Sequence, residues 1–297
     1  GFDVMVVWRQ YFTPKKNARV CSMTSREPVD IAAIRAAVAN PNGPYARVDY
    51  TAFTGSTNAD LVAAGHQNAP AWTAAVTEYQ NSGRGRHGRV WTAPKGSQVT
   101  LSILIRPTAE SIERLGTMPL VSGLAIIDAL TATASRHPDA TDKLTPQLKW
   151  PNDVLIDGRK LCGILAEAVS LGPEPAVVIG LGLNVSITTE ELPVPHATSL
   201  DLEAPGIEID RAQLTADVLL ALHHRINQWV DADPQLMADY RAVCSSIGAD
   251  VKVLLPGDEE LLGTVRDVAD DGRLVVVDKQ GSEHVLAAGD VTHLRLQ

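Results

Sequence analysis

Apolar residues along this chain recur with two different spacings, and each spacing predicts a type of secondary structure. Spacings of three and four residues predict helices at 29–38, 56–64, 112–135 (as one helix or two), 214–230 and 234–247. Alternating or short continuous apolar runs predict strands at 47–53, 72–79, 99–105, 148–150, 154–156, 161–169 and 177–185. Helices and strands intermix over this stretch, which predicts an α+β body.

The pattern changes after Gly248. Short apolar runs at 251–255, 261–268, 274–277 and 284–286 are separated by Pro256-Gly257, Asp271-Gly272 and Gln280-Gly281. Turn signals every ~8–12 residues predict a small all-β barrel. We therefore expect residues 23–46 to be an N-terminal helix and linker, 47–247 the α+β body, and 248–297 the barrel.

The first 22 residues differ from the rest of the chain. They show no clear period, and they contain four of the 13 aromatic residues, namely Phe2, Trp8, Tyr11 and Phe12. We expect residues 1–22 to be a leader or tag without stable structure.

Charge and composition exclude several classes of partner. The net charge is −9, and an acidic chain is a poor general ligand for nucleic acid, which is bound by basic surfaces. No apolar run approaches the ~18–20 residues of a membrane span. Cys21, Cys162 and Cys244 have neither metal-ligand nor disulfide-framework spacing, which is typical of thiols in a reducing cytoplasm. We expect a cytoplasmic protein with no nucleic-acid or membrane partner.

The densest chemical signal is the loop Gly83–Trp91, which contains Arg84, Arg86 and Arg89. It includes the spacing G-x-G-x-x-G, but a β-rich run follows, so no helix can begin there to bind a dinucleotide. Glycines allow close approach of the backbone, and arginines form bidentate contacts with phosphates or carboxylates. The loop is either an anion clamp or a solvated basic hairpin loop.

Three further motifs have both a chemical and a structural interpretation. Lys149 precedes a rigid Trp150-Pro151-Asn152-Asp153 break and either points into a cleft or faces water from an edge strand. Gly180-Leu181-Gly182-Leu183-Asn184 predicts a bulge or a ligand against the backbone. Thr54-Gly55-Ser56-Thr57-Asn58 suits a polar ligand at a helix start, or capping alone.

Taken together and in order, these segments resemble the biotin protein ligase family. The resemblance covers about residues 47–295 and is carried by the segments 55–58, 78–80, 83–91, 149–153, 160–165 and 180–185. It implies a mixed or antiparallel catalytic sheet with flanking helices, similar to class II synthetases, followed by an SH3-like barrel. It also implies a ligase that converts biotin and ATP, with Mg²⁺, to biotinyl-5′-AMP. The biotinyl group is then transferred to a lysine of the biotin carboxyl carrier domain of acyl-CoA carboxylases.

The resemblance assigns roles to residues of this chain. Lys149 and Arg86 match catalytic positions. Biotin-binding positions match Ser56, Thr57, Asn58, Gln80, Arg84, Gly85, Arg86, Lys149 and Gly163. Adenylate-binding positions match Arg84, Arg86, Arg89, Trp91, Asn152 and Asn184. Asp153 is a weak candidate for a metal ligand. Because aromatics are scarce in the body, Trp91 and Trp150 are both expected at the ligand site.

Bifunctional members of the family begin with a winged-helix DNA-binding domain. About 45 residues precede the catalytic body here, so we expect a monofunctional ligase, as a monomer or a homodimer. The nearest alternative is a lipoate protein ligase, although the sequence Gly88-Arg89-Val90-Trp91 favours biotin over lipoate. A non-catalytic biotin-sensing regulator or adaptor is the alternative from another class.

Overall fold

The computed structural model describes residues 26–255, 257 and 259–294. The expected leader at 1–22 lies outside these residues. The α-helices are α2 (Ile31–Val38), α3 (Thr57–His66), α4 (Ala109–Ile112), α5 (Met118–Ser135), α6 (Leu200–Glu203), α7 (Arg211–Val230) and α8 (Gln235–Val243). Short 3₁₀ turns are η1 (Arg86–Gly88), η2 (Leu115–Thr117) and η3 (Thr189–Glu191).

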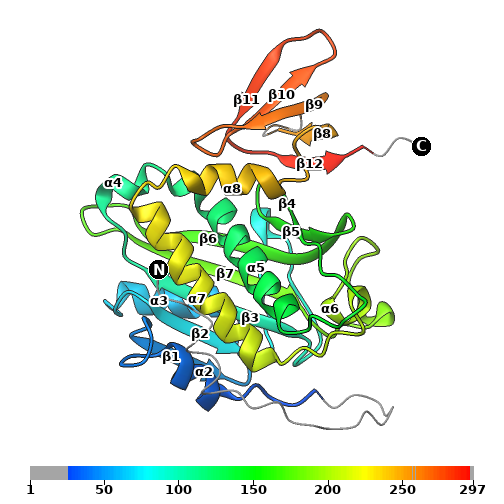
Figure 1. Cartoon of the computed structure of the whole chain (residues 1–297). Helices are drawn as coiled ribbons and strands as arrows, with labels where there is room; N and C mark the ends of the chain where they lie inside the picture. The colour runs from blue at the N-terminus through cyan, green and yellow to red at the C-terminus, as the bar shows by residue number, and fades with distance from the viewer. Residues whose placement is uncertain (1–25, 256, 258, 295–297) are drawn as a thin grey trace.

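The body is built on a seven-stranded mixed sheet (Figure 1). Its strands are β1 (Arg47–Thr51), β2 (Thr73–Thr77), β3 (Gln98–Ile105), β4 (Gln147–Lys149), β5 (Asp153–Ile156), β6 (Arg159–Ser170) and β7 (Ala176–Asn184). They are ordered β1-β2-β3-β7-β6-β5-β4, with β1 and β2 parallel and the other pairs antiparallel. The predicted α+β class with a mixed sheet is confirmed.

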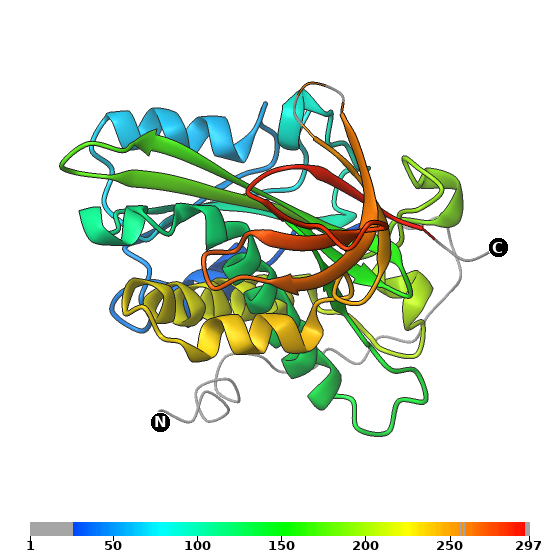
Figure 2. The same cartoon turned by 90° about the horizontal axis from the view of Figure 1, so that it is seen from above.

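Helices cover both faces of this sheet. Helix α3 lies on one side, and α5, α7 and α8 lie on the other (Figure 2). Helix α5 packs mainly against α7 and continues into the central apolar core. The segment Leu115–Ser135 is long and apolar enough to span a membrane, but 61% of its most apolar window is buried inside the protein. It therefore packs as a core helix.

The C-terminal part is a five-stranded antiparallel sheet, ordered β11-β10-β9-β8-β12. Its strands are β8 (Asp250–Leu254), β9 (Glu260–Val268), β10 (Leu274–Asp278), β11 (Glu283–Leu286) and β12 (Asp290–His293). An all-β tail was predicted, but β12 was not. Trp150 anchors this sheet to the body, because its indole Nε1 donates to Gly272 O at 2.9 Å.

Helix α8 ends four residues before the predicted boundary. Cys244 has extended backbone angles, and Ser245 N donates to Leu148 O at 2.7 Å, so the chain pairs with β4 at this point. The prediction of a helix to residue 247 was wrong because pairing with a distant strand outweighs local helical spacing.

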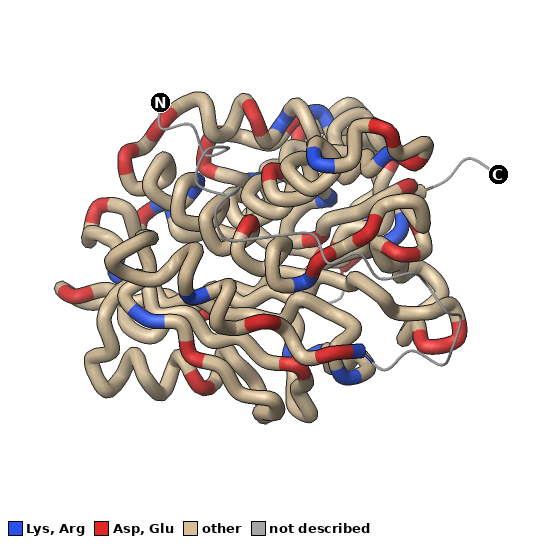
Figure 3. The backbone as a smooth tube through the Cα atoms, turned by 60° about the horizontal axis from the view of Figure 1, so that its bottom comes forward, with Lys and Arg blue, Asp and Glu red and all other residues tan. Residues whose placement is uncertain are grey.

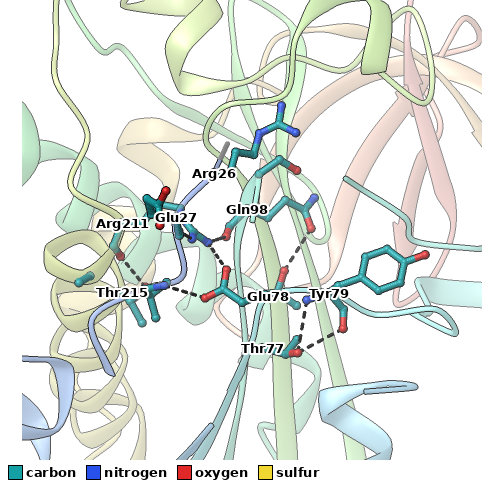
Figure 4. A network of polar contacts seen from close by, with 12 residues as sticks. Arg26, Glu27, Thr77, Glu78, Tyr79, Gln98, Arg211 and Thr215 are labelled. Carbon is teal, nitrogen blue, oxygen red and sulfur yellow. Dashed lines mark hydrogen bonds and ion pairs between the residues drawn. The ribbon is translucent and has the colours of Figure 1, made fainter. Parts of the chain in front are cut away.

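A buried ion pair between Arg211 and Glu78 lies where the N-terminal segment meets the body (Figure 4). Arg211 at the start of α7 lies 2.9 Å from Glu78 Oε2, and its Nη1 donates to Gln98 O at 3.1 Å. The other carboxylate oxygen of Glu78 accepts from Val29 N at 2.7 Å. This network fixes Glu78, directly after β2, and Gln80 follows Glu78 by two residues.

Candidate functional site

One cavity of about 1220 Å³ collects the predicted site residues. It lies between the sheet, the loop 83–91, the turn between β4 and β5, and strand β12. It is lined by Ser56, Thr57, Asn58, Gln80, Arg84, Gly85, Arg86, Arg89, Trp91, Lys149, Asn152, Asp153 and Gly163. Segments far apart in the sequence therefore form one site.

The cavity carries more positive than negative side chains. In the protein as a whole, Asp and Glu positions are distributed along the entire chain (Figure 3). Six Lys or Arg side chains and three Asp side chains line it, whereas the whole chain carries a net charge of −9. A local excess of positive charge with low-dielectric walls attracts anions. The cavity is therefore suited to phosphate or carboxylate ligands.

Burial shifts the pKa of two cations of the cavity, Lys149 and Arg86. Burial lowers the pKa of Lys149, and the nearby carboxylate of Asp153 opposes that effect. Burial likewise lowers the pKa of Arg86, opposed mainly by Asp290. A partly desolvated cation interacts more strongly with an anion than one in water does.

Sequence reasoning missed several polar residues of the cavity, among them Lys160, Asp290 and His293. Lys160 Nζ lies 2.7 Å from Asp153 Oδ1 and 5.3 Å from the centroid of the Trp91 ring. Asp290 and His293 come from β12. Burial and the charge of Lys149 lower the pKa of His293. Lys160 lies two residues after the Asp157-Gly158 turn, and this position is the local signal that could have found it.

The arginine loop is held by the C-terminal sheet. Arg89 forms an ion pair with Asp290, and Arg86 Nη1 lies 3.9 Å from the same carboxylate. Arg86 Nη2 also donates to Gly289 O at 3.3 Å. Within the loop, η1 is a single 3₁₀ turn with His87 at φ 56°, so no α-helix begins there. Loop and C-terminal sheet together form one wall of the cavity.

The glycines of β6 and β7 make space for side chains. Gly180 and Gly182 of β7 pair regularly with β3, so the bulge that was one of the two predictions for these glycines is not present there. A Cβ on Gly182 would overlap Trp91 Nε1, and one on Gly163 would lie 3.1 Å from Trp91 Cζ3. The indole ring of Trp91 therefore packs against Gly163 and Gly182, beside Lys160.

The uncharged end of the cavity is formed by the first turn of α3. Ser56 is the N-cap and accepts from Ala59 N at 3.4 Å. Thr57 N donates to Gln80 Oε1 at 2.8 Å. Asn58 lies over Gly180, where a Cβ would overlap its Oδ1. Hydroxyl and amide groups without charge suit a neutral polar ligand group.

Two predicted ligand residues are placed differently from the expectation. Asn184 is buried and does not line the cavity. Its Oδ1 accepts from Gln98 Nε2 at 2.6 Å and its Nδ2 donates to Thr198 O at 2.8 Å. Trp150 borders the cavity but is 2% exposed, and its indole N–H is held by the C-terminal sheet. Its main contacts are therefore structural.

The remaining predicted residues are held by neighbours. Asn152 Nδ2 donates to Ile164 O at 2.8 Å, and its Oδ1 accepts from Arg86 at 3.3 Å. Asp153 is paired with Lys160, and the described residues contain no cluster of three metal-ligating side chains. A lone carboxylate fits Mg²⁺ that is bound mainly by nucleotide phosphates and water.

Comparisons with known proteins agree with this geometry. Residues 50–184 match the model described as "Biotin/lipoate A/B protein ligase family", and residues 246–294 match "Biotin protein ligase C terminal domain". The biotin--[acetyl-CoA-carboxylase] ligase of Mycobacterium tuberculosis is 41% identical over 271 residues, which are 91% of this chain and 97% of that protein. The bifunctional ligase/repressor BirA of Escherichia coli is 30% identical over 205 residues, 68% of this chain and 61% of that protein. A solved biotin protein ligase from Aquifex aeolicus, in complex with biotin and ATP, has a similar fold, with a TM-score of 0.67 and 23% identity over 85% of this chain and all of that one.

Proposed function

Because this chain belongs to the biotin protein ligase family, we propose that it activates biotin with ATP and transfers the biotinyl group to a protein lysine. The observation that supports this most is the arrangement of charged and uncharged groups around this cavity. One end is uncharged and polar, and the other gathers Lys149, Arg86 and Lys160. Biotin has a neutral ureido ring at one end and a carboxylate at the other, so its two ends match the two ends of the cavity.

The first half-reaction joins two anions. A carboxylate oxygen of biotin attacks the α-phosphorus of ATP, the bond from that phosphorus to the bridging oxygen breaks, and pyrophosphate leaves. Positioning and positive charge are the main needs of such a step. We assign Lys149 and Arg86 to the reacting carboxylate and α-phosphate, because both are partly desolvated and line the same cavity.

Other residues would hold the nucleotide and protect the product. Arg84, Arg89 and the loop backbone would cover the phosphate, and Trp91 offers a ring face for the adenine. A closed loop keeps water away from the mixed anhydride. Mg²⁺ on the triphosphate would add positive charge, with Asp153 as the carboxylate that faces it.

In the second half-reaction, the amine of an acceptor lysine attacks the acyl carbon of biotinyl-5′-AMP, and AMP leaves. We propose the biotin carboxyl carrier domain of acyl-CoA carboxylases as the acceptor, in the cytoplasm. The name of the Mycobacterium tuberculosis relative and the match over almost its whole length support this choice.

Biotin-dependent ATP–pyrophosphate exchange tests the first half-reaction. We expect exchange with the wild type, no exchange with Lys149→Ala, and slow exchange with leakage of adenylate for Arg86→Ala. A streptavidin blot with a carrier domain tests the transfer. Absence of both exchange and label in the folded wild type would refute the ligase function, and label with lipoate instead of biotin would favour the lipoate alternative.

A further inference from the structure

Arg26 ties the N-terminal segment to a loop that lines the cavity. The loop covers residues 185–199, between β7 and α6, and its residues 193–196 border the cavity. Arg26 does not line the cavity, and its side chain is 13% exposed. Figure 4 shows that this side chain points away from the ion pair between Arg211 and Glu78. Its guanidinium therefore makes contacts separate from that ion pair.

The guanidinium of Arg26 binds the loop at two points. Arg26 Nε donates to Ser186 Oγ at 3.1 Å, and Nη2 donates to Ser186 O at 2.7 Å. Arg26 Nη1 donates to Glu191 Oε1 at 3.1 Å, and Nη2 also donates to Glu191 Oε2. The hydrogen bond from Arg26 lowers the pKa of Glu191, so this group is a carboxylate at neutral pH. A planar, bidentate contact of this kind fixes the orientation of the loop as well as its distance.

The part of the loop around η3 has few buried contacts to hold it in place. Its own hydrogen bonds are local: Thr188 N donates to Glu191 Oε2 at 3.0 Å, and Glu191 N donates to Thr188 O at 3.1 Å. Residues 188–191 and 193–196 are exposed. A segment with few buried contacts opens at a low cost in free energy. The contacts of Arg26 therefore strongly influence how often the loop is in place.

The other end of the loop lies on the Trp91 side of the cavity. Lys160 N donates to His196 O at 2.7 Å, and Thr198 N donates to Lys160 O at 2.9 Å. The side chain of Lys160 lies near the Trp91 ring, with Nζ 5.3 Å from the ring centroid. The wall that the loop forms is therefore close to the ring that we assign to the adenine of ATP.

The N-terminal segment is itself anchored to the body. Arg211 Nη2 donates to Glu27 O at 2.5 Å. The segment also crosses Gly96, where a Cβ would lie 2.9 Å from Arg26 Cβ and 3.4 Å from Arg26 O. Arg26 therefore links the loop to a fixed part of the protein.

We propose that Arg26 is a positioning residue that holds residues 186–196 as a wall of the cavity, so that its loss weakens the binding of ATP more than the binding of biotin. This inference rests on the proposed function, in which Trp91 faces the adenine. Lys149 and Arg86 keep their places when Arg26 is removed, so the rate at saturating substrates stays the same.

The test is the variant Arg26→Ala, with both KM values and kcat measured by biotin-dependent ATP–pyrophosphate exchange. We expect the KM for ATP to rise about threefold or more, because only the fraction of molecules with the loop in place binds ATP well. The KM for biotin and kcat should stay within about twofold of the wild type. Arg47→Ala is the matched control, because Arg47 forms an ion pair with Asp49 at 2.9 Å and neither residue lines the cavity. It should keep the wild-type KM for ATP.

A double variant tests whether Arg26 acts through Glu191. Glu191→Gln weakens the same contact but keeps an oxygen that accepts from Thr188 N. We therefore expect Glu191→Gln to raise the KM for ATP in the wild type, and to raise it no further in the Arg26→Ala background. Additive effects of the two substitutions would contradict an action of Arg26 through Glu191.

Amide hydrogen exchange of residues 187–196 gives a readout that does not depend on activity. We expect exchange there to be faster in ligand-free Arg26→Ala than in the wild type, and unchanged in Arg47→Ala. A wild type that shows no biotin-dependent ATP–pyrophosphate exchange would refute the proposed function. In an active enzyme, a KM for ATP that does not rise in folded Arg26→Ala, or that rises no more than the KM for biotin, would overturn the role of Arg26 and leave the ligase function standing. Unchanged hydrogen exchange of the loop would overturn that role in either case.

Discussion

Gly180→Ala should expel Asn58 from its place over β7. A Cβ on Gly180 would overlap Asn58 Oδ1, lie 2.8 Å from Asn58 Cγ and lie 3.0 Å from Ser102 Oγ. Asn58 cannot give way cheaply, because its amide is bound to Glu167, Leu165 and Ser102. Displacement of Asn58 therefore breaks its hydrogen bonds to Glu167, Leu165 and Ser102 together.

The magnitude follows from two costs. Inserting a methyl group into a packed site costs ~1–3 kcal/mol, and losing a hydrogen bond to a charged group costs ~1.5–3 kcal/mol. Part of the second cost is recovered, because Glu167 is only partly buried and water can reach it. We expect the free energy of unfolding to fall by about 2–4 kcal/mol, and the affinity for biotin to fall by at least about tenfold.

The free energy of unfolding is measured by urea denaturation, monitored through tryptophan fluorescence. The affinity for biotin is measured by calorimetric titration. Asn58→Ala in the Gly180→Ala background removes the clashing group and should restore ~1 kcal/mol or more of stability without restoring biotin binding. Gly172→Ala is the control, because its Cβ would meet nothing closer than Ser170 Oγ at 3.9 Å. Additive effects of the two substitutions would refute the packing of Asn58 against Gly180.

Three further outcomes follow from contacts between the body and the C-terminal sheet. Asp290→Asn frees Arg89, and limited trypsin digestion without ligand should cut the arginine loop up to about fivefold faster, a modest factor because the ion pair is half-exposed. An unchanged rate of digestion would contradict the role of the Arg89–Asp290 ion pair in holding the loop. Trp150→Phe leaves Gly272 O without its indole donor and should lower the free energy of unfolding by about 1 kcal/mol at constant m-value in urea. The pKa of His293 is lowered in the folded state, so its contribution to stability is complete above its unfolded pKa of about 6.5 and is lost as pH falls through the folded pKa, at up to ~1.4 kcal/mol per pH unit. Wild type should lose more stability than His293→Gln between about pH 6.5 and pH 5 in urea melts, and equal losses would contradict the buried neutral imidazole.

Features governed by short-range forces were predictable from the sequence. Ser56 caps α3, and Asp157-Gly158, both with positive φ, make the two-residue turn between β5 and β6. The existence and approximate positions of the main strands followed from their apolar spacing. In contrast, β12 has one buried residue, Val291, in four. Its pairing with β8 comes from tertiary contacts that a periodic pattern does not record.

Site residues were predictable where one segment of the sequence carries several polar groups. They were missed where a single residue reaches the site from a segment that is distant in the sequence. The ion pair between Arg89 and Asp290 joins positions 201 residues apart. Nothing in the sequence around Asp290 indicates that partner. The resemblance assigned Asn184 to the nucleotide, and the glycines before it predicted a bulge or a ligand against the backbone, but the space beside those glycines is occupied by Asn58 and Trp91. A glycine pattern indicates a close approach, and only the folded chain shows what approaches.

The charge of the cavity bears on the transfer step. No local pattern in the sequence indicates a base for the acceptor lysine, which must attack as a neutral amine. Nearby cations lower the pKa of an ammonium group because like charges disfavour its protonated form. Lys149, Lys160 and Arg86 line the cavity where the acyl carbon would lie under the proposed function. The positive charge that holds the phosphate would therefore also promote loss of the acceptor's proton, so one set of residues would serve both half-reactions.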